Sequence, residues 1–202
     1  MMTVAYPVRK GLYINMTNRC PCACTFCLRK NADGVYGSDP LWLEREPTVE
    51  EVCDAIGRFD LSAFEEIVFC GYGEPTERLD DLLAVAAYLK AHCDLPLRIN
   101  TNGLADLIHG EPTAHKLKGL IDTVSVSLNA TNAEDYAAVV RPKFGIGSYD
   151  AMLRFTKDCT AYVPHVMMTV VGEPVTTPEE QARCQAICDR LGASLRIRPY
   201  ED

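Results

Sequence analysis

"TVSVSLN", residues 123–129, alternates polar and apolar side chains at every position, which is the pattern of a β-strand with two different faces. The stretch "LRINTN", residues 97–102, has a similar alternation. Further runs rich in β-branched or other apolar residues predict strands at 12–17, 66–71, 165–171 and 194–200. Helical patterns lie between these strands, near 48–58, 79–92, 113–119, 132–140, 148–159 and 178–191. Strands that alternate with helices predict a parallel sheet with right-handed crossovers.

Two of the predicted helices begin with capping residues. Thr48 and Glu51 have the spacing of a capping box, in which each side chain accepts a hydrogen bond from a backbone N–H of the first turn. Thr177 and Glu180 repeat this spacing, and Pro178 occupies the first helical position, where its missing N–H costs nothing. These signals predict where the two helices start.

The polar side chains of the predicted strands share one face. They are Tyr13, Asn15, Thr17, Arg98, Asn100, Asn102, Ser125, Ser127, Asn129, Arg196, Arg198 and Tyr200. A parallel sheet covered on both faces usually shows continuous apolar runs, and a closed eight-stranded barrel has a branched apolar interior. We therefore predict an α/β fold in which six parallel strands form a partial, open (β/α)6 barrel of the TIM type around a polar ligand. The alternative is that these side chains lie on an exposed sheet face.

Composition places the chain among folded cytoplasmic proteins. Apolar residues make up 48% of the 202 residues and charged residues 24%, and no linker divides residues 1–202, so a single domain is expected. The sequence has no signal peptide and no apolar run long enough to span a membrane, so no membrane partner is expected. The formal charge of −8 argues against a nucleic-acid partner, which requires a basic surface.

Cysteines cluster in "NRCPCACTFCLRK", residues 18–30, directly after the first predicted strand. Thiols of a cytoplasmic protein stay reduced, so this clustering indicates metal binding or catalysis. Cys20, Cys24 and Cys27 form C-x3-C-x2-C, and three thiolates on a short loop can ligate three irons of a [4Fe-4S] cluster. The fourth iron is then open to a substrate or cofactor. Cys22 lies outside this spacing and would point away or serve as a reserve thiol.

A structural zinc site is the alternative use of the cysteines. Such a site pairs C-x2–4-C with a second, distant pair, which Cys184 and Cys188 would supply. Their spacing within a predicted helix also fits one buried helix face. The isolated cysteines, interpreted as structural, are Cys53, Cys70, Cys93 and Cys159.

Two motifs together resemble the signature of the radical S-adenosylmethionine (radical SAM) superfamily. The first is the cysteine motif with an aromatic residue before its third cysteine, as Phe26 precedes Cys27. The second is "CGYGEPT", residues 70–76, which resembles the superfamily's Gly-Gly-Glu-Pro motif with Tyr72 in place of one glycine. The resemblance spans nearly the whole chain. The start "NRCPCACTFC" and the short length also resemble the small TatD-linked radical SAM proteins.

The resemblance implies a [4Fe-4S] cluster and S-adenosylmethionine as cofactors, with Cys20, Cys24 and Cys27 as iron ligands. Further residues implied in S-adenosylmethionine binding are Phe26 at the adenine, Tyr72, Gly73 and Glu74 at the methionine ammonium, Asn102 in "NTNG" (100–103), and Ser127 and Asn129 at the ribose. Arg141 in "VVRP" is a candidate partner of the cofactor's carboxylate, with the end of a helix as the alternative. For Ser127 and Asn129 the alternative is a strand end capped by polar residues.

The implied activity is that of a radical SAM enzyme, an oxidoreductase. A reduced cluster cleaves S-adenosylmethionine to a 5′-deoxyadenosyl radical, which abstracts hydrogen from a small-molecule substrate. The expected partner is a one-electron donor such as flavodoxin or ferredoxin. One alternative is a glycyl-radical-type activase, or a peptide or protein maturase, that uses the same chemistry. The other is a non-catalytic iron–sulfur or zinc-binding module.

Two further groups of residues are candidates around the barrel opening. Segment 31–47, with Tyr36 and Trp42, follows the cysteines and is a candidate lid. The arginines of the polar face are candidate contacts of an anionic substrate, with salt bridges inside the barrel as the alternative; they are Arg98, Arg196 and Arg198. Arg29 and Lys30 are expected to be solvated at the surface.

Overall fold

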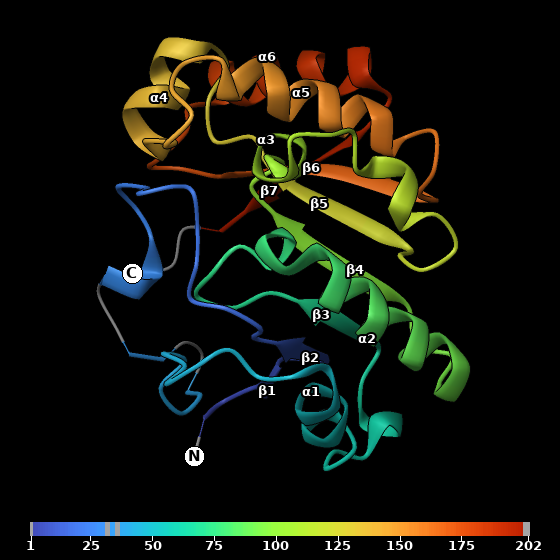
Figure 1. Ribbon diagram of the computed structural model, residues 1–202. Helices are drawn as coiled ribbons and strands as arrows, with labels where there is room; N and C mark the ends of the chain where they lie inside the picture. Colours follow the sequence, from blue (N-terminus) through green and yellow to red (C-terminus); the bar gives the residue numbers. More distant parts are fainter. Residues whose placement is uncertain (1, 31–32, 35–36, 200–202) are drawn as a thin grey trace.

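One mostly parallel sheet runs through the computed structural model, which describes residues 2–30, 33–34 and 37–199 (Figure 1). Its strands lie side by side in chain order. They are β1 (Ala5–Val8), β2 (Gly11–Ile14), β3 (Glu66–Phe69), β4 (Leu97–Thr101), β5 (Thr123–Ser127), β6 (His165–Val171) and β7 (Ser194–Arg198). Strands β2 to β7 are parallel, and β1 and β7 form the two edges. The predicted open arrangement of six parallel strands is confirmed.

Strand β1 has no counterpart among the predicted strands. It pairs antiparallel with β2 through a turn in which Arg9 adopts a φ of 53°. A strand this short, with Pro7 inside it, gives a weak sequence signal, and proline fits an edge strand because it has no N–H for a second partner. The predicted strand 12–17 ends at Ile14, so Asn15 and Thr17 lie beyond the ladder.

Helices connect the parallel strands and cover the apolar face of the sheet (Figure 1). They are α1 (Val49–Ile56), α2 (Leu79–His92), α3 (Ala105–His109), α4 (Ala133–Val140), α5 (Ser148–Cys159) and α6 (Pro178–Leu191). Both capping boxes are present, at the starts of α1 and α6. The predicted segment 113–119 forms only the 3-10 helix η4 (Ala114–Leu117), and α3 was not predicted because a helix of this length shows no periodicity. The other short helices are η1 (Leu28–Lys30), η2 (Leu61–Ala63) and η3 (Pro75–Arg78).

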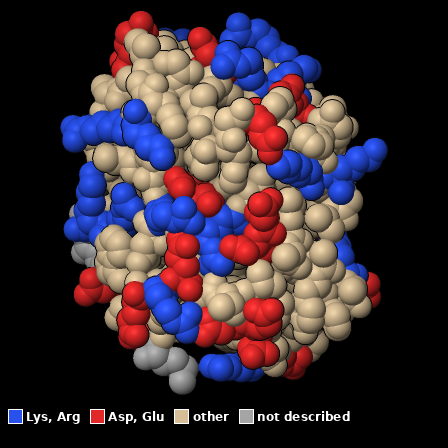
Figure 2. All heavy atoms as spheres, in the orientation of Figure 1, with Lys and Arg blue, Asp and Glu red and all other residues tan. Residues whose placement is uncertain are grey.

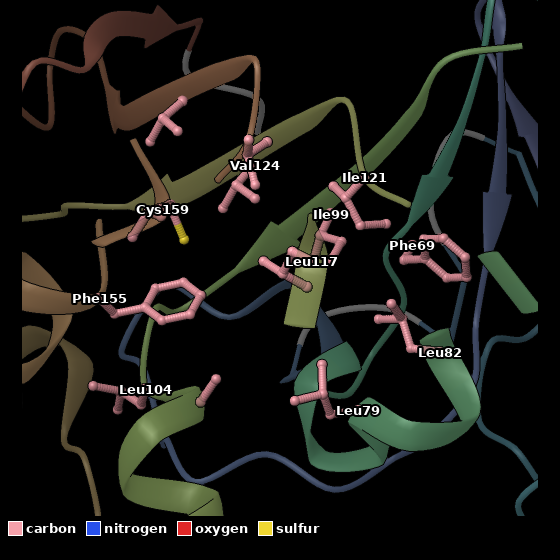
Figure 3. Packing of buried hydrophobic residues seen from close by; sticks show 14 of the residues in the cluster. Phe69, Leu79, Leu82, Ile99, Leu104, Leu117, Ile121, Val124, Phe155 and Cys159 are labelled. Carbon is pink, nitrogen blue, oxygen red and sulfur yellow. The ribbon is translucent and has the colours of Figure 1, made fainter. Parts of the chain in front are cut away.

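A continuous apolar core fills the space between sheet and helices. In Figure 3, Phe69 of β3 lies beside Leu82 of α2, and Phe155 of α5 lies beside Leu104. The apolar side chains on the alternate strand positions were expected to pack under the helices, and most of them are buried: Leu12, Ile14, Met16, Leu97, Ile99, Val124, Val126 and Leu128. On the edge strand β7 this expectation fails, because Leu195 is only half-buried and Ile197 is 47% exposed. Complete burial of one large apolar side chain stabilises a fold by about 1.5–3 kcal/mol. Exposed ion pairs contribute at most about 1 kcal/mol each, so this core holds the helices on the sheet.

The polar residues of neighbouring strands share the opposite face, because the register pairs Arg98 with Thr123 and Thr169 with Arg196. Arg98 is buried there and makes a bidentate ion pair with Glu66, at 2.6 and 2.9 Å. It therefore forms the alternative salt bridge and is not free to bind an anion. Arg196 is exposed, Arg198 is half-buried, and Tyr200 lies outside the described residues.

No helix in the described part of the chain combines the length and apolar character needed to cross a membrane. On the surface seen in Figure 2, lysine and arginine side chains are interspersed with aspartate and glutamate. Charge is therefore mixed on this side of the molecule.

Candidate functional site

The cysteine-bearing segment 20–27, here called the cysteine loop, is docked onto the end of α4. The N–H of Ala23 donates to the carbonyl of Val140 at 3.1 Å, and the N–H of Thr25 donates to that of Val139 at 2.9 Å. The last carbonyls of a helix have no partner within the helix, so the loop supplies the donors that α4 lacks. This contact places the thiols at the carboxyl ends of the parallel strands.

The thiols of the cysteine loop lie close together. Cys22 is buried, so it does not point away from the cluster, while Cys20, Cys24 and Cys27 are half-buried. Hydrogen bonds to the sulfurs of Cys20 and Cys24 raise the pKa of the Cys22 thiol, with burial adding to the rise, and the same contacts lower the pKa of Cys20 and Cys24. Burial raises the pKa of Cys27. Cys22 therefore remains the protonated donor of the group.

Within the described residues, no three Cys, His, Asp or Glu side chains are arranged to hold a single metal ion. Two of the motif thiols, Cys20 and Cys24, instead share hydrogen bonds with Cys22.

A glycine turn after β3 presses directly against the backbone that leads into the cysteine loop. A Cβ atom on Gly73 would lie 2.2 Å from the carbonyl oxygen of Thr17 and 2.6 Å from that of Arg19. Only glycine allows this approach. The next residue, Glu74, donates its backbone N–H to the Arg19 carbonyl at 2.8 Å. The two motifs are therefore in direct contact.

Glu74 joins the ends of β3 and β4 through its side chain. It is 4% exposed, and its carboxylate accepts hydrogen bonds from the hydroxyl and N–H of Thr76, the hydroxyl of Thr101 and the N–H of Asn102. Burial raises the pKa of Glu74, and these donors oppose the rise. The carboxylate thus holds the turn after β3 and the end of β4 together.

Asn102 connects the end of β4 to the cysteine loop. Its side-chain amide nitrogen lies 3.6 Å from the sulfur of Cys22 and 4.0 Å from that of Cys20. Its side-chain oxygen accepts from the N–H of Leu104 at 2.9 Å, which fixes the orientation of the amide. The amide N–H groups therefore face sulfur.

Tyr72, the aromatic residue in place of a motif glycine, packs against the candidate lid. Its ring meets that of Trp42 edge to face, with centroids 5.2 Å apart, and Leu41 lies in the same apolar cluster. The amides of Asn15 and Asn18 donate to lid carbonyls, each at 2.7 Å. The described part of the lid is thus held down at several points, while Tyr36 lies outside the described residues.

The basic residues after the cysteines hold backbone carbonyls and are not simply solvated. The guanidinium of Arg29 lies 3.3 Å from the carbonyl oxygen of Cys22, 3.4 Å from that of Asn18 and 3.5 Å from that of Tyr72. The ammonium of Lys30 donates to the carbonyl of Cys24 at 2.5 Å. The carbonyls around the glycine turn therefore accept hydrogen bonds from a cation.

The remaining predicted cofactor residues surround the cysteine loop less closely. Phe26 is exposed. Ser127 ends β5, and Asn129 follows it with a φ of 60°; neither side chain has a hydrogen-bond partner among the described residues. Arg141 ends α4 in the left-handed conformation, the alternative proposed for it, and its side chain is exposed. Its position also puts its backbone carbonyl 3.3 Å from the N–H of Ala23 in the cysteine loop.

The residues present fit an iron–sulfur group with a bound cationic ligand. Three motif thiols share one loop, and the carbonyls of the glycine turn accept from a guanidinium. The fully buried hydroxyl of Tyr136 in α4 has no partner among the described residues. Sequence reasoning missed Tyr136 because its position in an amphipathic helix identifies it only as a core residue. A separate surface hollow, near His115 and Tyr162, lies where the chain enters β5 and β6, at the opposite strand ends.

Comparison with known proteins identifies relatives of this chain. Residues 14–183 match the radical SAM superfamily. A GTP 3′,8-cyclase of Mycobacterium sp. (strain KMS) is 27% identical over 193 residues, which cover 94% of this chain and 51% of the cyclase. A probable GTP 3′,8-cyclase of Methanosarcina acetivorans is 30% identical over 131 residues, or 64% of this chain and 36% of that relative. The chain spans about half the length, or less, of these curated relatives.

Solved structures with the same fold come from enzymes of low sequence identity. A radical SAM methyltransferase from Sphaerobacter thermophilus superposes with a TM-score of 0.59 at 18% identity, over 98% of this chain and 68% of that one. Methylornithine synthase superposes with a TM-score of 0.57 at 14% identity, over 95% and 53% of the two chains. At these identities the likeness concerns the fold alone.

Proposed function

This chain belongs to the radical SAM superfamily, and from that premise we propose that it cleaves S-adenosylmethionine reductively to a 5′-deoxyadenosyl radical that abstracts hydrogen from a small substrate. Members of the superfamily are enzymes that use a [4Fe-4S] cluster and S-adenosylmethionine. The domain that would do this is residues 1–202, whose described strands lie in one sheet and pack on one main apolar cluster. A one-electron donor such as flavodoxin or ferredoxin would supply the reducing electron.

The convergence of three segments at one end of the sheet carries the proposal. The cysteine loop follows β2, the glycine turn follows β3, and Asn102 follows β4. The hydrogen bond from Glu74 to Arg19 joins the first two segments, and the contact between Asn102 and Cys22 joins the third. In barrels of this type, active sites lie at the carboxyl ends of the parallel strands.

Cys20, Cys24 and Cys27 would hold the cluster, which when bound and reduced supplies one electron to S-adenosylmethionine. The carbonyls of Tyr72 and Gly73 would accept from the methionine ammonium, and the contact of the Tyr72 carbonyl with Arg29 supports a cation at this place. Glu74 would act by fixing the turn, since four donors already occupy its carboxylate.

The other side chains would hold the rest of the cofactor. Ser127 and Asn129 retain free hydrogen-bonding groups for the ribose within the described structure. Phe26 exposes an aromatic surface for the adenine. Arg141, an exposed guanidinium next to the cysteine loop, would pair with the carboxylate.

A purine nucleotide is the substrate class that we propose. The GTP 3′,8-cyclase of Mycobacterium sp. aligns with 94% of this chain and the probable one of Methanosarcina acetivorans with 64%. Arg98 is engaged by Glu66, but the buried Nε of Arg198 has no partner in the described part of the chain. An unpaired guanidinium on the polar face offers charge-assisted hydrogen bonds to phosphate.

Anaerobic reconstitution with iron and sulfide, followed by reduction in the presence of S-adenosylmethionine, tests the proposal. We expect wild type and Cys22→Ala to release 5′-deoxyadenosine, and Cys24→Ala to lose most of its bound iron and at least about tenfold in rate, because a ligand is missing. Addition of GTP should increase release by the wild type.

Two results would contradict the proposal. If no variant binds iron, or if iron binds and S-adenosylmethionine stays intact, a non-catalytic metal module is the better account. If Cys22→Ala loses iron and Cys24→Ala keeps it, the assignment of the ligands is wrong. If added GTP does not change the release of 5′-deoxyadenosine, a purine nucleotide is not the substrate. An activase or a peptide or protein maturase is then the next candidate.

A further inference from the structure

The hydroxyl of Tyr136 is a polar group that the fold buries completely. The side chain is 0% exposed, and its oxygen has no hydrogen-bond partner among the described residues. Burial of an unpaired hydroxyl is unfavourable, and native proteins pair nearly all such groups. The ring packs against Tyr149 with centroids 5.5 Å apart, so apolar packing accounts for the ring and leaves the hydroxyl unexplained.

Tyr136 lies on the helix that supports the cysteine loop. It stands one turn before Val139 and Val140, whose carbonyls receive the N–H groups of Thr25 and Ala23. The apolar cluster that contains Tyr136 also contains Cys22, and Cys20 and Cys24 pack against it. The cysteine loop is therefore attached to the end of the helix that carries Tyr136.

The phenol is held in the form that donates a hydrogen bond. Burial raises the pKa of Tyr136, and negative charge on Cys24 or Glu74 adds to the rise. A protonated phenol can donate its proton to one sulfur acceptor at a time. Asn102 already presents amide N–H groups to Cys20 and Cys22, so a second donor from α4 would complete the surroundings of the thiols.

We propose that the Tyr136 hydroxyl donates a hydrogen bond to a sulfur atom of the iron–sulfur group or of its cysteine ligands, and so raises the reduction potential of that group. The inference rests on the proposed function, because it requires the cluster to be there. Hydrogen bonds to sulfur stabilise the more negatively charged, reduced cluster and are among the features that set its potential. Tyr136 is therefore a positioning residue.

Redox titration of the reconstituted cluster, followed by electron paramagnetic resonance without S-adenosylmethionine, tests this inference. The variants are Tyr136→Phe and, as the matched control, Tyr149→Phe, whose hydroxyl is not among those buried without a partner in the described structure. We expect equal iron content in all three proteins. The potential should shift to more negative values in Tyr136→Phe and stay unchanged in Tyr149→Phe.

Thermal unfolding of the iron-free and reconstituted proteins gives a second readout. Without iron, Tyr136→Phe should melt at the same temperature as wild type or higher, because it removes an unpaired buried hydroxyl. With the cluster bound, Tyr136→Phe should no longer melt at a higher temperature than wild type, because the hydroxyl of the wild type then has a partner.

Three outcomes would overturn the inference. The first is the same potential in Tyr136→Phe and wild type. The second is a Tyr136→Phe protein that fails to fold without iron, because the hydroxyl would then have a structural role in the chain itself. The third is a wild type that takes up no iron, which refutes the proposed function as well. A wild type that binds iron but does not cleave S-adenosylmethionine would refute the proposed reaction. The reduction potentials of the variants would still test the role of Tyr136.

Discussion

At the scale of single residues, Glu74 shows how one buried carboxylate can hold several segments of a site together. All four of its hydrogen bonds come from protein donors, on Thr76, Thr101 and Asn102. A carboxylate is suited to this position because it has only acceptors. The side chain thereby fixes the glycine turn and the amide of Asn102 relative to the thiols.

Glu74→Gln tests this clamp. The new NH2 group must face at least one donor, so we expect the free energy of unfolding to fall by about 1–3 kcal/mol. Chemical denaturation of the iron-free protein measures it. Thr76→Val, which removes only the 2.7 Å bond from the Thr76 hydroxyl to the carboxylate, serves as the control and should lose less. A Glu74→Gln variant as stable as wild type would show that the carboxylate is not used in this way.

At the scale of elements, helix ends do much of the positioning. The last carbonyls of α4 receive the cysteine loop, and the start of α1 is closed by the capping box of Thr48 and Glu51. Glu74 caps the start of the helix η3, and its side chain accepts from the N–H of Thr76. Loops and turns that carry the site are thus attached to regular structure by the backbone groups that a helix leaves unpaired.

The capping box of α1 provides a prediction with a pH dependence. Thr48→Ala should lower the free energy of unfolding by about 1 kcal/mol, since one N–H of the first turn loses its partner. Hydrogen bonds from Arg45 and from the N–H of Thr48 lower the pKa of Glu51 to about 2. A lowered folded-state pKa means that the stabilisation is complete above the ordinary range of the carboxyl and is lost as pH falls toward 2.

Thermal melting of wild type and Glu51→Gln across pH checks the second part of this prediction. The difference in melting temperature should be present at pH 7 and shrink between about pH 4.5 and pH 2. Glu50→Gln, on the same turn but outside the capping box, is the control. A difference that stays constant with pH would contradict an ionised Glu51 as the cause.

At the scale of the whole molecule, the sheet and the main apolar cluster are continuous from one edge strand to the other. The main cluster includes Val4, before β1, and Ala193, before β7. The candidate lid is joined to this body through Tyr72, Asn15 and Asn18. We therefore expect the chain to unfold as one cooperative unit.

Urea unfolding followed by two signals tests this expectation. Trp42, the single tryptophan, lies in the candidate lid, so its fluorescence reports on that segment, while far-ultraviolet circular dichroism reports on the sheet and helices. The two transitions should coincide. An earlier transition in fluorescence would show that the lid opens before the body unfolds, and two transitions in circular dichroism would divide the chain into separate units.

The sequence by itself determined the repeating architecture and the chemistry of the donors. Alternation in stretches such as "TVSVSLN" follows the two-residue period of a strand, and a capping box joins groups three residues apart. Both patterns can therefore be predicted from residues that are close together in the sequence. The C-x3-C-x2-C spacing of Cys20, Cys24 and Cys27 can be predicted from the sequence for the same reason, because it lies within one short segment. The short strand β1 and helix α3 were missed because too few residues carry their pattern.

Only the tertiary structure decided which groups meet. Asn102 and Cys22 are 80 positions apart in the chain, and no local pattern connects them. Glu74 proved to be a clamp, Arg98 an ion-paired side chain, and Tyr136 a buried hydroxyl without a partner among the described residues, although each residue type alone allowed other uses. The physical reason is that hydrogen bonds and burial depend on distances in space, which are set only when the strands and helices pack together.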